Sequence, residues 1–294
     1  MKAAIIDVGS NTVRLLVCAR DGAKLDTLRE EREHLFLGED VERDGKLSRE
    51  RIAEAARCAR AYARIGRGLG AVVEVIVTAP GRQSANSAAL VKAVGKASGA
   101  TVRILSADEE GLLAFAGAVA SAGPFAGSVA VCDVGGGSTE VVIGTVAGGP
   151  AWTHSVDLGA VRLTQRFLAD DPPGKGALAA ARDEVERHLE GLTPPLPQAA
   201  LAAGGTARAL RKLVGRTLDA DELEAALDIL GKRSSARVAK TFGLHEHRAR
   251  TLPAGAVILA ALRQRLFVPL SVARTGLREG AALARLDELA ASAA

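Results

Sequence analysis

Apolar runs alternate with amphipathic segments along the chain, and this pattern indicates an α/β protein. Short apolar runs bounded by glycine, proline or polar residues are typical of buried strands; they occur at 3–8, 13–19, 71–78, 101–105, 128–133, 139–145, 151–157 and 199–203. The segments between them predict helices at 47–66, 84–97, 160–168 and 177–190, a helix that opens at 108, and mainly helices after 203, apart from an apolar segment at 267–273. Strands that alternate with helices in this way define the α/β class.

One motif occurs twice, and each copy opens one half of the chain. The first copy is Asp7-Val8-Gly9-Ser10-Asn11-Thr12, and the second is Asp133-Val134-Gly135-Gly136-Gly137-Ser138-Thr139-Glu140. Each consists of a strand, an acidic residue, a glycine turn with hydroxyl side chains, and a second strand. Self-similarity over this distance predicts two related domains that face each other, at 1–123 and 124–294.

The repeated motif has the chemistry of a phosphate loop. Glycines let backbone N–H groups converge on an anion because no Cβ blocks the approach, and the hydroxyls add donors. The acidic residue cannot hold a phosphate itself, but it can hold a cation that does, or orient a water molecule. An ordinary glycine turn explains one copy equally well; two copies favour a pair of loops that clamp a phosphate chain. The chain contains neither a P-loop motif nor a dinucleotide fingerprint.

The composition narrows the range of partners. The chain has 294 residues, of which 48% are apolar and 24% charged, so the bulk of it is not intrinsically disordered. Only 3% are aromatic, which argues against a stacking platform for single-stranded nucleic acid, and we expect no DNA partner. The net charge of +4 permits attraction to polyanions without demonstrating it.

The cysteines and the apolar segments indicate a cytoplasmic protein. Cys18, Cys58 and Cys132 are odd in number and lie far apart, as expected of free, buried thiols in a reducing compartment. No signal-peptide pattern precedes the first strand. The longest uncharged stretch, 111–132, is interrupted by glycine, proline and serine, so no membrane span is expected.

Both loops resemble the phosphate loops of the exopolyphosphatase / guanosine pentaphosphate phosphohydrolase (Ppx/GppA) family. The resemblance runs over nearly the whole chain, and the other stretches similar to the family are 37–39, 45–48, 78–86, 109–110, 158–164, 204–208, 252–255 and 276–280. It implies two related actin-like domains of the ribonuclease H-like, sugar kinase/Hsp70/actin superfamily, facing a central cleft. It also implies a short two-domain form, without the extra C-terminal helical domains of longer members.

The resemblance also assigns roles to individual residues. It implies that Glu110, the second residue of a Glu-Glu pair, is the catalytic base, with Glu109 as a supporting partner. The acids expected to bind Mg²⁺ or another divalent cation are Asp133, Glu140 and Asp7. The residues expected to bind phosphate are Gly9, Ser10, Asn11, Thr12, Arg82, Gly135, Gly136, Gly137, Ser138, Thr139, Gly204, Gly205 and Thr206. Arg82 suits this role because its planar guanidinium matches phosphate oxygens.

Some positions depart from the family pattern or have an open role. Gly111-Leu112 follows the Glu-Glu pair where the family usually has Ala-Arg, which removes a cation near the expected base. Pro80-Gly81 precedes Arg82 and can reshape the substrate loop. Arg57, Arg60, Arg64 and Arg67 recur at helical spacing; a solvated face is the simpler interpretation, and a path for polyphosphate is the alternative.

The leading hypothesis is a metal-dependent exopolyphosphatase that releases terminal orthophosphate from inorganic polyphosphate by the attack of a water molecule. A guanosine pentaphosphate 5'-phosphohydrolase is the enzymatic alternative, because the sequence does not separate the two substrates. A nucleotide- or polyphosphate-binding sensor with little turnover is the alternative of another class. We expect no membrane partner, and a homodimer is left open.

Overall fold

The computed structural model describes the whole chain except residues 22, 23, 124 and 294. It divides into two compact units, which are described separately below. The first unit comprises Met1–Ala120 together with Leu277–Ala294, and the second comprises Ser121–Gly276.

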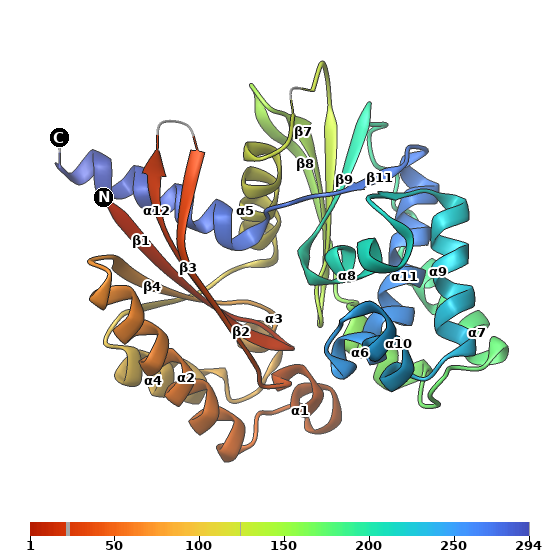
Figure 1. The fold of residues 1–294 in the computed structure, drawn as a ribbon, viewed down its shortest axis with the longest axis horizontal. Coiled ribbons are helices and arrows are strands. Elements are labelled where there is room, and N and C mark those ends of the chain that lie inside the picture. The colour runs from red at the N-terminus through yellow and green to blue at the C-terminus, as the bar shows by residue number, and fades with distance from the viewer. Residues whose placement is uncertain (22–23, 124, 294) are drawn as a thin grey trace. The chain divides into compact units, whose positions relative to one another are not determined.

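The first unit is built on a five-stranded sheet with the strand order β3-β2-β1-β4-β5 (Figure 1). The strand β1 pairs antiparallel with β2 and parallel with β4. The elements of this unit are β1 (Lys2–Val8), β2 (Thr12–Asp21), β3 (Lys24–His34), α1 (Leu37–Asp44), α2 (Arg49–Gly68), β4 (Val72–Val77), α3 (Ala79–Gln83), α4 (Ser87–Ser98), β5 (Thr101–Ile104), α5 (Ala107–Ala120) and α12 (Leu277–Ala293).

Helices cover both faces of this sheet because its central strands are apolar on both sides. Ile6 of β1 packs in one cluster with Ala59 of α2 and Val94 of α4. Its neighbour Ile5 points the other way and packs in a second cluster with Leu286 of α12. A continuous apolar run is expected for a strand buried on both faces, and the β1 residues 3–6 are all fully buried.

The division of the chain differs from the expected domains at 1–123 and 124–294. The last helix, α12, packs against α5, β1 and β2, so residues 277–294 belong to the first unit. The close approach of α12 and α5 requires a glycine. A Cβ at Gly280 would overlap the backbone carbonyl of Leu113 on α5. A contact between residues this far apart in sequence leaves no signal in local hydrophobic periodicity.

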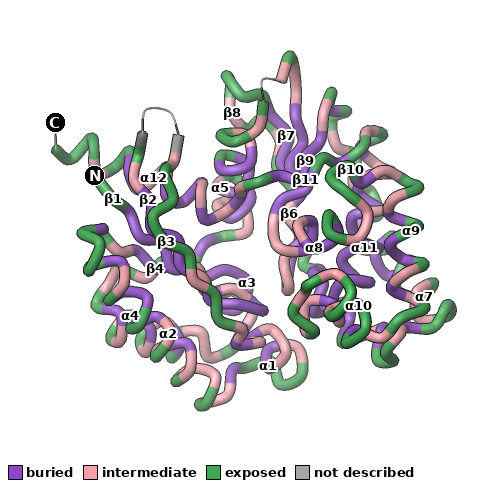
Figure 2. The backbone as a smooth tube through the Cα atoms, viewed as in Figure 1, coloured by how far each residue is buried: buried purple, intermediate pink, exposed green. Residues whose placement is uncertain are grey.

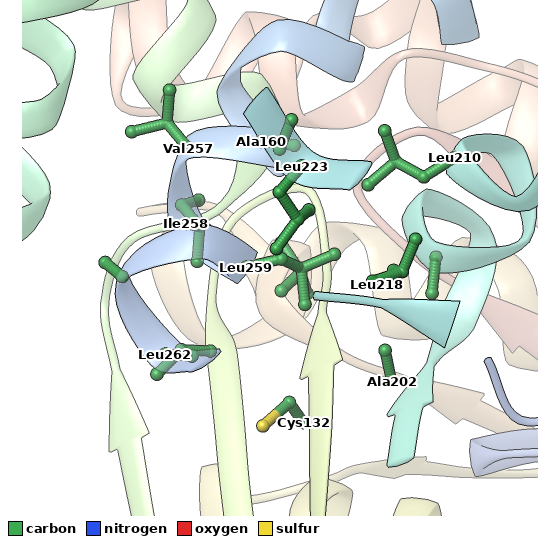
Figure 3. Close-up of a cluster of buried hydrophobic side chains, with 14 of the residues drawn as sticks. Cys132, Ala160, Ala202, Leu210, Leu218, Leu223, Val257, Ile258, Leu259 and Leu262 are labelled. Atoms are coloured by element: carbon green, nitrogen blue, oxygen red, sulfur yellow. The ribbon is translucent and has the colours of Figure 1, made fainter. Parts of the chain in front are cut away.

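The second unit contains a six-stranded sheet with the order β10-β11-β9-β6-β7-β8. Its main core lies between the sheet and the helices; Figure 3 shows Cys132 of the central strand facing Leu259 and Leu262. The elements of this unit are β6 (Val129–Val134), β7 (Thr139–Thr145), β8 (Gly149–Val156), α6 (Ala160–Phe167), α7 (Lys175–His188), β9 (Ala199–Ala203), α8 (Gly204–Val214), β10 (Thr217–Leu218), α9 (Ala220–Lys232), α10 (Ser235–Phe242), α11 (Glu246–Leu266) and β11 (Leu270–Val272).

The repeat seen in the sequence is also a repeat of topology. In each unit the first strand forms an antiparallel hairpin with the next strand and pairs parallel with a strand that follows a helix. The turns match in detail. The N–H of Gly9 donates to the carbonyl of Thr12 at 3.0 Å, and the N–H of Gly135 donates to the carbonyl of Ser138 at 3.0 Å. The two halves are therefore related folds, as the repeat predicts.

Two further expectations concern membranes and cysteines. Among the described residues, no helix is both long enough and apolar enough to span a bilayer. Cys18 and Cys132 are buried free thiols, as expected, whereas Cys58 is only partly buried. Burial raises the pKa of Cys132 to about 12, with a smaller contribution from neighbouring Asp133.

Candidate active site

The first candidate loop, between β1 and β2, is buried and contains an unsatisfied amide. Ser10, Asn11 and Thr12 are 6%, 6% and 7% exposed. The side-chain nitrogen and oxygen of Asn11 are buried and make no hydrogen bond with any residue that the structure describes. Because such groups are costly to bury unpaired, they indicate a place where a ligand can supply the partner.

A neighbouring corner, Leu35–Gly38, holds the backbone of this loop. The N–H groups of Leu35 and Phe36 both donate to the carbonyl of Asn11, at 3.1 and 3.2 Å, and the N–H of Gly38 donates to the carbonyl of Ser10 at 2.7 Å. A Cβ at Gly38 would lie 2.8 Å from the Cβ of Ser10, so only glycine fits. Phe36 is in the left-handed region, with φ 54°, a conformation that costs a non-glycine residue about 1 kcal/mol or more. The family resemblance includes residues 37–39 of this corner and implies no role for them.

Arg82 and Glu110 form a close ion pair in the first unit. Nη1 of Arg82, on α3, donates to Oε2 of Glu110, on α5, at 2.7 Å and to the carbonyl of Leu105 at 2.9 Å. Glu110 is 7% exposed, so its carboxylate lies in a mostly desolvated environment. The structure thus brings together the expected base and one expected phosphate ligand.

The preceding residue, Glu109, has a different task. Its carboxylate accepts from the N–H of Ser106 at 2.8 Å, while the Ser106 hydroxyl accepts from the N–H of Glu109 at 3.1 Å. This reciprocal capping box satisfies N–H groups at the start of α5. The pKa of Glu109 lies below its usual range, chiefly because its carboxylate accepts the backbone hydrogen bond from Ser106. Partial desolvation raises the pKa and opposes this effect, whereas Arg103 lowers it further. Leu112, where the family usually has an arginine, is partly exposed.

Asp7 is the penultimate residue of β1, opposite Arg14 of β2 in the strand register. It lies in the first unit, whereas the other two expected metal ligands, Asp133 and Glu140, lie in the second. Nε of Arg14 donates to Oγ1 of Thr12 at 3.2 Å, so this arginine contacts the first loop directly.

The second candidate loop, between β6 and β7, is held by the start of α6. Ser138 and Thr139 are 3% and 1% exposed. The N–H of Ala160 donates to the carbonyl of Gly135 at 2.9 Å, and a Cβ at Gly159 would overlap the backbone of Gly136. Each loop is therefore held in place by backbone N–H groups of a later segment. The hydroxyl of Thr139 donates to the carbonyl of Leu158 at 2.6 Å, so this side chain ties the loop to the segment before α6.

Two carboxylates of the second unit face each other across the strand pair. Asp133 and Glu140 are directly opposed in the β6–β7 register. Glu140 is 2% exposed, and its Oε1 accepts from the hydroxyl of Ser155 at 3.2 Å. Gly204 adopts a φ of 80°, and a Cβ there would overlap the Asp133 carboxylate, so glycine lets the start of α8 approach this acid.

The donor set of this carboxylate pair fits magnesium. Within the part of the chain that the structure describes, no group of three or more His, Cys, Asp or Glu side chains could enclose a metal ion. Mg²⁺ does not require such a cage, because it is usually held by one or two carboxylates, substrate phosphates and water. Oxygen donors of this number and type suit that cation better than zinc, which prefers nitrogen and sulfur.

The third expected phosphate site, at residues 204–206, opens α8. The Thr206 hydroxyl donates to the carbonyl of Val134 at 2.9 Å, and the side chain is 1% exposed. Nη1 of Arg248, on α11, lies 3.5 Å from the same hydroxyl oxygen. Thr206 therefore ties α8 to β6 through its side chain, and only backbone N–H groups of this segment remain as candidate phosphate donors.

Comparison with known proteins identifies the family. The model of the Ppx/GppA phosphatase family matches residues 16–289. The chain belongs to the Ppx/GppA phosphatase family. Exopolyphosphatase 1 of Mycobacterium tuberculosis is 30% identical over 306 residues, which cover 98% of this chain and 89% of that relative. Exopolyphosphatase 2 of the same species is 31% identical over 296 residues, which cover 90% and 91%.

Solved structures of Ppx/GppA proteins have the same architecture. The family member from Aquifex aeolicus superposes with a TM-score of 0.83 at 27% identity, over 98% of both chains. An exopolyphosphatase from Cytophaga hutchinsonii gives 0.89 at 21% identity, over 98% of both chains, and supports the fold alone. The expected actin-like α/β fold is thereby confirmed, and family membership makes this Ppx/GppA protein a phosphoric anhydride hydrolase.

Proposed function

We propose that the protein is a metal-dependent exopolyphosphatase that releases terminal orthophosphate from inorganic polyphosphate. The observation that carries the proposal is the buried Glu110 carboxylate paired with Arg82 in a phosphatase-family chain. Relatives named exopolyphosphatase at about 30% identity support the choice of substrate.

Glu110 would position and deprotonate the attacking water. The water oxygen forms a bond to the terminal phosphorus, the bridging P–O bond breaks, and the water proton passes to the Glu110 carboxylate. A base must be ionised to accept a proton, and the guanidinium of Arg82 at 2.7 Å is a favourable neighbour for that form. The same guanidinium can bind oxygens of the reacting phosphate, where negative charge is spread in the transition state.

Asp133 and Glu140 would hold the divalent cation. When bound, Mg²⁺ supplies positive charge that neutralises phosphate oxygens. The second loop, 135–139, would add backbone N–H donors to a phosphate, and the buried amide of Asn11 would do the same from the first loop.

The decisive test is a phosphate-release assay on Glu110→Gln. Purified protein with Mg²⁺ and long-chain polyphosphate should release orthophosphate, and Glu110→Gln should lower kcat by about 10²–10⁴-fold with binding retained. Glu109→Gln is the matched control because glutamine also fits a capping box, so its activity should stay near that of the unaltered protein. No release from polyphosphate of any length would refute the proposal.

The same assay separates the alternatives. Guanosine pentaphosphate and polyphosphate, run side by side with and without Mg²⁺, identify the preferred substrate. Hydrolysis of the nucleotide alone would make the protein a guanosine pentaphosphate 5'-phosphohydrolase. Tight binding of polyphosphate or a nucleotide with very slow turnover would make it a sensor.

A further inference from the structure

The exposed sides of α2 and α4 carry only basic and small residues over most of their length. Both helices cover one face of the first unit's sheet and pack against each other. Figure 2 shows exposed residues recurring along both helices. From residue 57 to the end of each helix, the exposed charged residues are Arg57, Arg60, Arg64, Arg67, Lys92 and Lys96, and the others are alanine or glycine. We call these six side chains the basic face.

The basic face contains no acid of its own, although Glu31 and Glu33 of the strand β3 act electrostatically on Cys58 and Tyr62 of α2. From residue 55 to residue 100 the sequence contains a single carboxylate, Glu74. Glu74 is 7% exposed and lies 3.2 Å from Arg103, outside the basic face. Among the described residues, none of the six basic side chains forms an ion pair; Arg67 instead donates to the carbonyls of Ser98 and Gly99, at 2.7 and 2.9 Å. The protein's net charge of only +4 therefore hides a local concentration of positive charge.

The cations follow a line along the helix. Positions 57, 60, 64 and 67 fall on one stripe of an α-helix, and ten residues extend about 15 Å along its axis. Lys92 and Lys96 lie one turn apart on α4, the helix that packs against α2. A row of point charges of this length complements a linear polyanion better than a compact anion.

The helices that carry the basic face start at the side of the unit that carries the first phosphate loop, and the line of arginines begins at Arg57, about 12 Å along the axis of α2 from its first residue. Helices that follow parallel strands start at the carboxyl edge of the sheet, where the 9–12 loop also lies. Near their starts, the two helices are joined by Asn86, whose side chain accepts from the N–H of Leu47 at 2.9 Å and donates to its carbonyl at 2.8 Å. A chain whose end reaches the loop could therefore continue over the basic face.

We propose that the basic face binds the distal segment of a long polyphosphate substrate, remote from the phosphate that is cleaved. This inference rests on the proposed function. Polyphosphate fits better than nucleic acid because the face offers cations with no other group that recognises a base. Its exposed residues include no aromatic side chain to stack on a base and no amide or hydroxyl side chain to read one.

The test compares chain lengths in a charge-removal variant. Arg57→Gln/Arg60→Gln/Arg64→Gln should lower kcat/KM for polyphosphate of hundreds of phosphates by about tenfold, mainly through KM, while triphosphate hydrolysis stays unchanged. The slope of log(kcat/KM) against log salt should become shallower by about 2 for the long substrate. Arg67 is left in place because it bonds α4 carbonyls. Lys175→Gln/Arg211→Gln/Arg216→Gln removes the same charge from scattered exposed positions of the second unit and should change neither substrate.

Binding separates this inference from the proposed function. In the Glu110→Gln background, calorimetry should show weaker binding of long polyphosphate when the three arginines are replaced. That result supports the basic face even if the protein hydrolyses another substrate. Equal binding with and without the arginines would refute the inference and leave the exopolyphosphatase proposal intact. Equally tight, arginine-dependent binding of a single-stranded oligonucleotide at the same salt would also overturn it, in favour of a nucleic-acid surface.

Discussion

At the residue scale, the two neighbouring glutamates make different contacts. Glu109 and Glu110 are identical in chemistry and adjacent in sequence, yet one caps a helix and the other pairs with Arg82. The sequence predicts an acidic helix start and, through the family resemblance, a base. It cannot separate the two roles, because the direction of each side chain depends on where Ser106 and Arg82 lie after folding.

The capping role of Glu109 predicts a pH-dependent effect on stability. Glu109→Ala should lower the free energy of unfolding by about 1 kcal/mol at neutral pH, because it removes one half of the capping box. The folded-state pKa of Glu109 is lowered, so its contribution is present above the unfolded pKa and is lost as pH falls through the folded value. Urea unfolding at neutral pH and at about pH 3 measures the difference, with Glu109→Gln as the uncharged control. A cost that does not shrink in acid would contradict this role.

At the element scale, both candidate phosphate loops depend on segments that follow them in the chain. The glycine turns are visible in the sequence because glycine, hydroxyl and acidic residues recur in order. The sequence indicates the Leu35–Gly38 corner only through the family resemblance at 37–39, and it does not predict the strand β3 before it. That strand is the edge of its sheet and carries charges at most positions, so no apolar alternation marks it.

A substitution in the Leu35–Gly38 corner should alter the first loop although it lies outside the loop sequence. Gly38→Ala places a Cβ against Ser10 and should displace the first loop by a few tenths of an ångström to about 1 Å. A displacement of this size should raise KM for polyphosphate by about tenfold or more. Gly68→Ala is the control, because a Cβ there meets no atom within 4 Å and alanine favours a helix. Steady-state kinetics with a thermal melt of each variant measure the effect. A change in melting temperature with unchanged KM would mean that the corner serves stability alone.

At the scale of the whole molecule, the sequence predicts two related halves and the structure confirms their common topology. The family resemblance supplies the fold because so many ordered motifs recur. The division between the units could not be read from the repeat, because the repeat marks where each half begins and carries no information on where the last helix packs. That packing depends on Gly280, a single position whose significance appears only when α5 lies beside it.

Gly280→Ala should destabilise the first unit. The added Cβ meets the Leu113 backbone, which cannot rotate away, and overpacking of this kind costs about 1–3 kcal/mol. Gly176→Ala in α7 is the control, since a Cβ there meets nothing within 4 Å. Hydrogen exchange should show the loss of protection concentrated in β1, β2 and α5, the elements that α12 contacts. Uniform loss over both units would contradict a local role for α12.

The return of the chain to its first unit has a consequence for synthesis. When the ribosome has made residues 1–120, the sheet face that includes Ile5, Leu16 and Ile76 still lacks α12, which is made after the second unit. The second unit is continuous in sequence and can be completed earlier. Although nascent domains usually fold from the N-terminus onward, here the first of the two units to emerge is finished after the second. Until then its unfinished apolar face is a surface that a chaperone can bind.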